Sequence, residues 1–273
     1  MKQTMAAKSR SKTISLLALF IGILCLYFPV TTTAVVAESG AAVDLLYLTL
    51  VWPGTLCRTG KCCMPTKGKP AIDFLIEDLK TMDQYGQIIQ NSKPKCSFSI
   101  NQMSSLIPDL YSNWCNLSCP CNDGFTNWKK TWCNYGRCSE LNQTSYIMTA
   151  LNLTASANLL EVFQVNGIVP SSSDSYKLGD IYIALMANLG LSTQVECVTI
   201  TKGASNSTLL SKINFCVSAD GQNFINCPFD IKQTCDRELW FYPFTRKQLK
   251  KCRKDYVSSG GLIKMATEKH LAM

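Results

Sequence analysis

The apolar positions in the N-terminal half of the chain first fall into two short runs. Residues 44–52, DLLYLTLVW, are rich in apolar β-formers and stop at Pro53 and Gly54, which predicts a buried strand closed by a turn. A cysteine-dense loop follows, and residues 72–79, IDFLIEDL, form a second apolar run. A polar stretch follows this run, so we expect residues 72–79 to form a second strand.

Apolar residues then recur at helical offsets in three longer segments. These segments are residues 103–114 (MSSLIPDLYSNW), 145–167 (SYIMTALNLTASANLLEVFQVNG) and 177–190 (KLGDIYIALMANLG). The last two end at a glycine, as helix C-termini often do, so we expect helices in all three segments. The apolar side chains expected in the core include Leu151, Leu159, Leu160 and Phe163.

From residue 195 onward the pattern changes to short apolar pieces separated by polar or glycine-containing turns. Residues 195–200 (VECVTI), 213–219 (INFCVSA) and 223–229 (NFINCPF) are typical of antiparallel strands. Strands and helices thus occur in mixed order, which predicts an α+β fold. The chain shows no Pro/Gly/Ser-rich linker and no internal repeat, which favours one domain over two.

The first 37 residues have the pattern of a secretory signal peptide. Four basic residues precede an apolar run over residues 14–30, which ends in small residues. We expect cleavage after Ala37, delivery through the secretory pathway to the cell exterior or the vacuole, and no stable membrane insertion afterwards. The alternative is an uncleaved signal anchor, because a run of this length lies near the lower limit for spanning a bilayer.

Cysteine usage supports an oxidising compartment. Cys25 lies in the signal segment, and the other fourteen cysteines form an even, high count that a reducing cytosol would rarely keep paired. We therefore expect disulfides. Four N-glycosylation sequons agree with a secretory route and predict a glycoprotein. They begin at Asn116, Asn142, Asn152 and Asn206.

The formal net charge of +8 is unevenly distributed. Residues 38–245 carry 15 Lys/Arg and 17 Asp/Glu, whereas residues 246–273 carry 8 and 2. Polyanion binding takes its affinity from clustered Lys and Arg, and the slightly acidic body has no such excess. We expect one domain over residues 38–245 and a flexible basic tail over residues 246–273. The tail is either an arm for polyanions or a solvated, disordered end.

Three segments share a pattern of tryptophan, proline, glycine and cysteine. They are residues 51–79 (VWPGTLCRTGKCCMPTKGKPAIDFLIEDL), 109–120 (DLYSNWCNLSCP) and 127–138 (NWKKTWCNYGRC). In this order they resemble the motifs W-P-G-x-x-C, C-C-x-P and F-x-I-H-G-L-W-P, then L-x-x-x-W-P-x-L-x-C, then F-W-x-H-E-W-x-K-H-G-T-C of the ribonuclease T2 family, in particular its plant S-like and S-ribonuclease branch. Cysteines in VECV, NFCV, NCPF and TC extend the resemblance to about residues 42–244.

The resemblance implies a fold, a reaction and a set of catalytic positions. The fold is a mixed α+β domain with a central antiparallel sheet, flanking helices and several disulfides, and the reaction is RNA transesterification through a 2′,3′-cyclic phosphate. The first motif's histidine falls on Glu77. The second motif's histidine, glutamate, lysine and last histidine fall on Lys130, Thr131, Asn134 and Tyr135, whereas Trp128, Trp132, Gly136 and Cys138 match the motif.

These substitutions bear on the chemistry, because transesterification needs one group that takes a proton from the 2′-hydroxyl and another that protonates the leaving oxygen. Histidine, with a pKa of about 6.5, suits both tasks. The chain's one histidine is His270, in the tail. Glu77 could act as a base, but lysine and tyrosine ordinarily titrate at about pH 10 and donate protons reluctantly. Lys130 remains a candidate phosphate contact, although an adjacent Glu77 would pair with it instead.

The resemblance also implies a disulfide framework. Its pairs are Cys57–Cys62, Cys63–Cys119, Cys96–Cys138, Cys197–Cys235 and Cys216–Cys227, and the cysteines without a counterpart are Cys115, Cys121, Cys133 and Cys252. Either Cys115 or Cys121 could pair with Cys133, and Cys252 could tie down the tail or bridge two chains. The CNLSCPC cluster could hold a metal, but it has no nearby histidine and lies in a secretory chain. We therefore expect extra disulfides there, and no metal or other cofactor.

Three functions follow from these observations. The first is a secreted, catalytically inactive protein of ribonuclease T2 type, kept for binding, defence, storage or recognition. The second is a weak or altered endoribonuclease that uses Glu77 and Lys130. The third is a protein that binds RNA without cleaving it, for which Trp128 and Trp132, four residues apart, would share one helix face and either stack on bases or pack in the core. The expected partners are RNA, bound weakly, or a protein.

Overall fold

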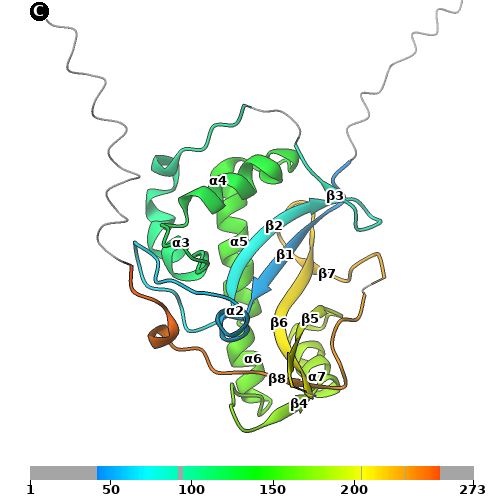
Figure 1. Ribbon diagram of the computed structural model, residues 1–273. Helices are drawn as coiled ribbons and strands as arrows, with labels where there is room; N and C mark the ends of the chain where they lie inside the picture. Colours follow the sequence, from blue (N-terminus) through cyan, green and yellow to red (C-terminus); the bar gives the residue numbers. More distant parts are fainter. Residues whose placement is uncertain (1–41, 92–94, 204, 231, 253–273) are drawn as a thin grey trace, which may run out of the picture. The chain divides into compact units, whose positions relative to one another are not determined.

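The computed structural model describes residues 42–91, 95–203, 205–230 and 232–252 (Figure 1). The expected signal peptide, residues 1–37, lies outside the described residues, as do His270 and the end of the expected basic tail. Across the part of the chain that the structure describes, no helix has both the length and the apolar character needed to span a membrane.

An eight-stranded sheet occupies the centre of the described residues. Its strand order is β3-β2-β1-β6-β8-β4, and β5 and β7 also pair with β6. The strands are β1 (Leu45–Val51), β2 (Leu75–Met82), β3 (Ile88–Ile89), β4 (Ser175–Lys177), β5 (Gln194–Lys202), β6 (Ser205–Ser218), β7 (Phe224–Ile225) and β8 (Glu238–Trp240). The pairings are antiparallel apart from a single parallel pair between β6 and β8. This sheet and its flanking helices confirm the α+β prediction.

Strand β1 lies between β2 and β6 and is buried along its whole length, which suits its largely apolar sequence. Leu48 lies opposite Leu79 of β2 and Phe215 of β6, and all three side chains belong to the main core. The opposite face of the sheet carries a smaller cluster around Tyr47, against which Phe229 packs. Alternation of side chains along the first half of β1 places Leu46 and Leu48 on the main-core face and Leu45 and Tyr47 on the opposite face.

Helices cover the main-core face of the sheet. Figure 1 shows α3, α4 and α5 together beside β1 and β2. The helices are α2 (Pro53–Thr59), α3 (Ile107–Asn113), α4 (Phe125–Asn134), α5 (Gln143–Ala157), α6 (Leu159–Val165) and α7 (Leu178–Leu189), with 3₁₀ turns η1 (Ile100–Leu106), η2 (Gly136–Cys138) and η3 (Arg246–Gln248). Leu151, Leu159 and Phe163 are buried in the core as expected, and Leu160 packs against it partly buried.

Two expected elements differ in the structure. Pro53 does not close a turn but starts helix α2, since proline is favoured in the first turn of a helix, and the Trp52 indole there donates a 2.7 Å hydrogen bond to the Tyr242 carbonyl. The long helix expected over residues 145–167 is two helices, because Asn158 adopts a left-handed conformation with φ of 39° and ends α5.

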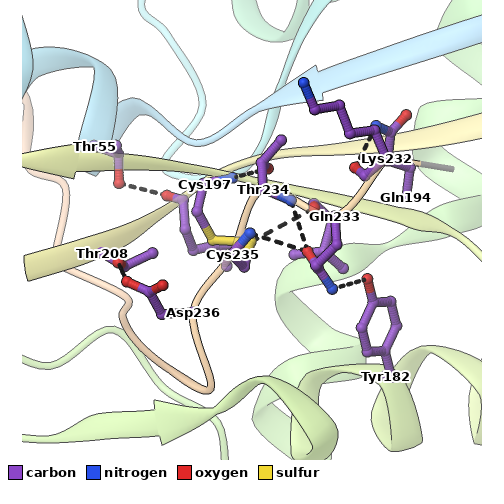
Figure 2. The surroundings of a disulfide bond; sticks show 12 residues. Thr55, Tyr182, Gln194, Cys197, Thr208, Lys232, Gln233, Thr234, Cys235 and Asp236 are labelled. Carbon is purple, nitrogen blue, oxygen red and sulfur yellow. Dashed lines mark hydrogen bonds between the residues drawn. A yellow bond between two sulfur atoms is a disulfide. The ribbon is translucent and has the colours of Figure 1, made fainter.

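A segment after β7 is fastened to β5 by the Cys197–Cys235 disulfide (Figure 2). Next to this disulfide, the Cys197 amide donates a hydrogen bond to the Thr234 hydroxyl at 3.0 Å. Figure 2 also shows Gln233 reaching Tyr182 of α7, where its amide donates to the phenol oxygen at 3.2 Å. The disulfide thus holds residues 233–235 between β5 and α7.

The described residues contain six disulfides, and one of the expected pairs is wrong. Cys57–Cys62, Cys63–Cys119, Cys197–Cys235 and Cys216–Cys227 pair as the resemblance implied. Cys96 pairs with Cys133 instead of Cys138, because Cys133 on the last turn of α4 lies within disulfide distance of Cys96, with 5.7 Å between the Cα atoms. Cys121 pairs with Cys252, and Cys115 and Cys138 are free thiols. Neither Cys115 nor Cys121 therefore pairs with Cys133.

The start of the expected tail continues the domain. Arg246–Gln248 form η3, and the amide of Lys250 donates to the Cys62 carbonyl at 3.0 Å. The Cys121–Cys252 disulfide then fixes the last described residue to the loop before α4. Residues 246–252 are therefore held against the body, and the flexible tail expected from the charge pattern does not begin at residue 246.

Candidate functional site

Glu77 occupies an irregular position in β2. Thr49 of β1 lies opposite Asp78, and the next residue, Leu50, lies opposite Ile76, so Glu77 is the extra residue of a β-bulge. Its carbonyl oxygen accepts hydrogen bonds from the Trp114 indole at 3.3 Å and from the Asn127 amide at 3.4 Å. A bulge redirects a side chain out of the regular alternation of a strand. Here the two hydrogen bonds to the Glu77 carbonyl hold the backbone and thereby set the direction of the Glu77 side chain.

The carboxylate of Glu77 forms an ion pair with Lys212 of β6. Glu77 Oε2 and Lys212 Nζ are 2.5 Å apart, and the two side chains are 40% and 30% exposed. The expected partner was Lys130, but that side chain is exposed on α4 and forms no ion pair with Glu77 among the described residues. The expectation failed because sequence proximity of two motifs says nothing about β6, which lies beyond β1 from Glu77.

A second charged pair lies next along β2. Lys80 Nζ is 3.1 Å from Asp78 Oδ2, and both side chains are largely buried. Burial raises the pKa of Asp78, and the neighbouring Lys80 ammonium acts in the opposite direction. Burial likewise raises the pKa of Tyr135, which makes its phenol a weaker acid than an exposed tyrosine.

Helix α4 carries the other expected site residues. Thr131 is buried, whereas Asn134 and Tyr135 are half-buried at the C-terminal end of the helix. The Asn134 carbonyl accepts the amide of Asn91 at 2.8 Å. The structure therefore brings Asn134 and Tyr135 together at one end of α4, while Lys130 points to solvent.

The two tryptophans of α4 serve packing. Trp128 is buried in the core, and its indole donates a 2.6 Å hydrogen bond to the Trp114 carbonyl. Trp132 is partly buried, packs on Tyr146 with ring centroids 5.7 Å apart, and donates to the Ser97 carbonyl. Trp128 therefore cannot stack on an RNA base, which contradicts that use of the tryptophan pair.

Gly136 owes its place to Trp132. A Cβ atom at residue 136 would lie 2.2 Å from Cε3 of the Trp132 ring, a distance that two carbon atoms cannot adopt. The glycine that the resemblance matched is thus explained by packing alone.

A cavity of about 200 Å³ opens beside Glu77. It combines apolar walls with the amides of Asn116 and Asn127 and the Glu77 side chain. The remaining lining residues are Val51, Leu56, Ile76, Cys115, Leu117 and Ser118. A small space with apolar walls and a few convergent polar groups suits a flat ring with polar edges.

The sequons occupy different environments. Asn152 and Asn206 are exposed, and Asn142 is exposed at the N-cap of α5. Asn116 is half-buried at the cavity, and its side-chain oxygen accepts the Ser118 amide at 2.9 Å. Within the described ranges, no group of three His, Cys, Asp or Glu side chains is arranged to hold a metal ion.

Lys212 is the site residue that sequence reasoning missed. It directly precedes the INFCVSA segment of residues 213–219, and in the structure it lies in the interior of β6. Its signal was a single charge just before an apolar run, but a lysine at the end of a predicted strand is ordinarily a solvated residue. Its partner can be identified only from the register that places Lys212 opposite Val51.

The described residues form an α+β domain cross-linked by disulfides, in which a carboxylate on a bulge of the central sheet lies beside a small cavity. Residues 43–227 match the family model described as "Ribonuclease T2 family". Ribonuclease 3 of Arabidopsis thaliana is 36% identical over 204 residues, which cover 74% of this chain and 90% of the relative. This chain belongs to the ribonuclease T2 family, in its plant branch.

Other relatives and solved structures agree. Extracellular ribonuclease LE of Solanum lycopersicum is 33% identical over 205 residues, covering 74% of this chain and 87% of the relative. The crystal structure of RNase NT in complex with 5′-AMP is 32% identical with a TM-score of 0.69, covering 74% of this chain and 98% of that one. The RNase-related protein from Calystegia sepium, 23% identical with a TM-score of 0.62, shares the fold; the match covers 74% of this chain and 98% of that one.

Proposed function

We propose that this chain is a secreted, glycosylated member of the ribonuclease T2 family that does not turn RNA over efficiently and acts by binding. The single observation that carries the proposal is the Glu77–Lys212 ion pair, with 2.5 Å between the charged atoms. The resemblance assigns Glu77 to the position of a catalytic histidine. A carboxylate oxygen held by a lysine ammonium has to leave that partner before it can take a proton from a ribose hydroxyl.

The other candidate proton donors support the same conclusion. Tyr135 has its pKa raised by burial, and Lys130 is exposed on α4 without Glu77 as a partner. A general acid works best when its pKa lies near the working pH, and losing one acid/base partner typically costs about 10²–10⁴-fold in rate. A nuclease built on Glu77 and Lys130 would first have to break the Glu77–Lys212 pair.

Secretion and glycosylation rest on the sequence. The basic and apolar pattern of residues 1–37, the six disulfides of the described residues and the exposed sequons at Asn142, Asn152 and Asn206 all suit an oxidising compartment. Two relatives from Solanum lycopersicum are named for different locations: extracellular ribonuclease LE and intracellular ribonuclease LX. A relative from Panax ginseng is named a ribonuclease-like storage protein.

RNA cleavage by the purified protein tests the proposal. The protein is incubated with RNA between pH 4 and 8 beside an active relative such as Ribonuclease 3, and cyclic-phosphate product is quantified. We expect at least about a hundredfold less product than the relative gives, because at least one acid/base partner is missing. Turnover equal to that of the relative, and abolished by Glu77→Ala, would refute the proposal.

A second candidate function, nucleotide binding without cleavage, is favoured by the cavity. Its Asn116 and Asn127 amides and apolar walls could hold a base, and the related RNase NT has been solved with 5′-AMP. Calorimetric titration with 5′-AMP tests this function. Binding by the wild type that Asn127→Ala weakens supports it, and heat changes identical to those of dilution argue against it.

A further inference from the structure

Cys96 is bonded to one cysteine of the α4–η2 region, and a second cysteine follows that partner closely in the sequence. Its present partner, Cys133, is on the last turn of α4, and Cys138 is a half-buried free thiol in η2. Hydrogen bonds to the residues before and after Cys96 hold this segment against the end of α4 and the following turn η2. The Lys95 carbonyl accepts from Arg137 at 2.7 Å, and the Ser97 carbonyl accepts from Trp132 at 3.2 Å.

Each of these hydrogen bonds joins a neighbour of Cys96 to a neighbour of a different cysteine. Arg137 precedes Cys138, and Trp132 precedes Cys133. The segment of residues 95–97 is therefore held by the side chains of the two residues that precede Cys133 and Cys138 in the sequence. The free thiol also remains close to the end of α4, since Cys138 Sγ lies 3.7 Å from the carbonyl oxygen of Asn134, the residue that follows Cys133.

We propose that Cys96 exchanges its disulfide partner between Cys133 and Cys138. The Cys138 thiolate attacks Cys96 Sγ, the Cys96–Cys133 bond breaks as the Cys96–Cys138 bond forms, and Cys133 leaves as a thiolate. The proton lost by Cys138 is taken up by Cys133. The reaction needs no oxidant or reductant, because one disulfide and one thiol are present before and after the exchange.

The exchange moves a cross-link from a helix to the turn that follows it. With Cys133 bonded, residue 96 is tied to α4, which carries Lys130 and Thr131. With Cys138 bonded, residue 96 is tied to η2, beyond Tyr135, and α4 is released from this constraint. The end of α4 thus has two covalent states, whether or not the proposed function holds.

The second free thiol, Cys115, provides an internal control. Its side chain is 7% exposed, and burial raises its pKa to about 12. Burial also raises the pKa of the half-buried Cys138, so both thiols need alkaline pH to form thiolate, and it is their positions that distinguish them. Cys115 lines the cavity beside Glu77, and its thiol donates to the Ser112 carbonyl at 3.8 Å and not to a group of the 95–97 segment. A Cys115→Ser variant should therefore exchange like the wild type.

Disulfide mapping of the full-length protein tests the proposal. Protein kept at about pH 4 is moved to about pH 8.5, the ordinary pKa of a thiol, quenched with acid at intervals and alkylated. Trypsin and chymotrypsin then cut after Lys95, Phe98 and Arg137, which separates Cys96, Cys133 and Cys138 onto different peptides. Mass spectrometry measures how much of Cys96 is linked to each partner.

We expect both linkages in the wild type, in a ratio that changes during incubation and stays fixed when N-ethylmaleimide blocks the thiol first. A single linkage at all times, or a ratio that incubation does not change, would overturn the proposal. The Cys133→Ser variant provides a second measurement: we expect a Cys96–Cys138 disulfide in it, and two free thiols at these positions would also overturn the proposal.

Discussion

Asp73 is a carboxyl group that the fold holds in a partly dehydrated position. It lines a cavity of about 100 Å³ beside Asn113 and Thr154, and it accepts the amide of Phe74 at 2.6 Å. Burial raises its pKa above the ordinary 3.8, and the hydrogen bonds from the backbone only partly offset this. The folded protein therefore binds a proton at Asp73 more tightly than the unfolded chain does.

This shift predicts how Asp73→Asn changes stability with pH. Because the folded pKa is raised, the stability that Asp73 contributes is present below the unfolded pKa of 3.8 and is lost as the pH rises through the folded pKa. An asparagine keeps an acceptor oxygen without a charge. We expect the variant to be more stable than the wild type at pH 7 and to lose that advantage near pH 3.5, as measured by urea midpoints at both values. An advantage that is independent of pH would contradict this account.

At the level of single residues, the sequence predicted which residues would occupy the site positions but not which side chains would contact one another. The glutamate at position 77 and the tyrosine at position 135 could be named from motif spacing alone. The ion pair of Glu77 could not, because Lys212 is supplied by β6, 135 residues later in the chain. The prediction of the disulfide partner of Cys96 failed for a related reason. Cys133 and Cys138 are near each other in the sequence, and the geometry of α4 decides which of the two thiols faces Cys96.

At the level of elements, Asn142 has two separate roles to test. It caps α5, because its side-chain Oδ1 accepts the amide of Ser145 at 2.9 Å, and it also begins a sequon. The cap uses the oxygen, and N-glycosylation modifies the nitrogen, so the two roles are compatible. A glycan at this position would therefore leave the start of α5 in place.

Two variants separate these roles. Asn142→Asp removes the glycan acceptor and keeps the cap, whereas Asn142→Ala removes both. In unglycosylated protein made in bacteria, we expect Asn142→Ala to lower the free energy of unfolding by about 1 kcal/mol and Asn142→Asp to change it far less. Urea unfolding measures both. Equal losses in the two variants would show that the cap contributes nothing.

The positions of several elements followed from periodicity, although helices α2 and α4 lie outside the three segments predicted to be helical. Strands β1, β2, β5 and β6 lie where apolar runs predicted strands, and α7 ends at Gly190 as expected. The break at Asn158 could not be found from periodicity, since the apolar positions continue across it into α6. The short strands β3, β4 and β8 were missed because runs of two or three residues carry no readable alternation.

At the level of the whole molecule, the Cys121–Cys252 disulfide is the cross-link with the longest span. It closes 131 residues, whereas Cys57–Cys62 closes five. In the chain-entropy account, the loss of conformational freedom in the unfolded state grows with the logarithm of loop length. The long cross-link should therefore stabilise the fold more than the short one.

Paired alanine variants measure this difference. We expect Cys121→Ala with Cys252→Ala to lower the free energy of unfolding by about 3 kcal/mol more than Cys57→Ala with Cys62→Ala does. Guanidinium unfolding of the two double variants gives the comparison. Similar losses from both would mean that contacts around residues 246–252, such as the Lys250–Cys62 hydrogen bond, hold the C-terminal segment without help from the disulfide.

Gly136 has a consequence for how such chains are recognised in genomes. The Trp132 ring leaves no room for a larger side chain at residue 136, and this ring packs on Tyr146 at the edge of the core. Searches that find nucleases by their glycines, tryptophans and cysteines are therefore detecting architecture. A search that scores the acid and base positions separately from the packing positions would separate this chain from relatives that share its tryptophans, glycines and cysteines but carry different acid and base residues.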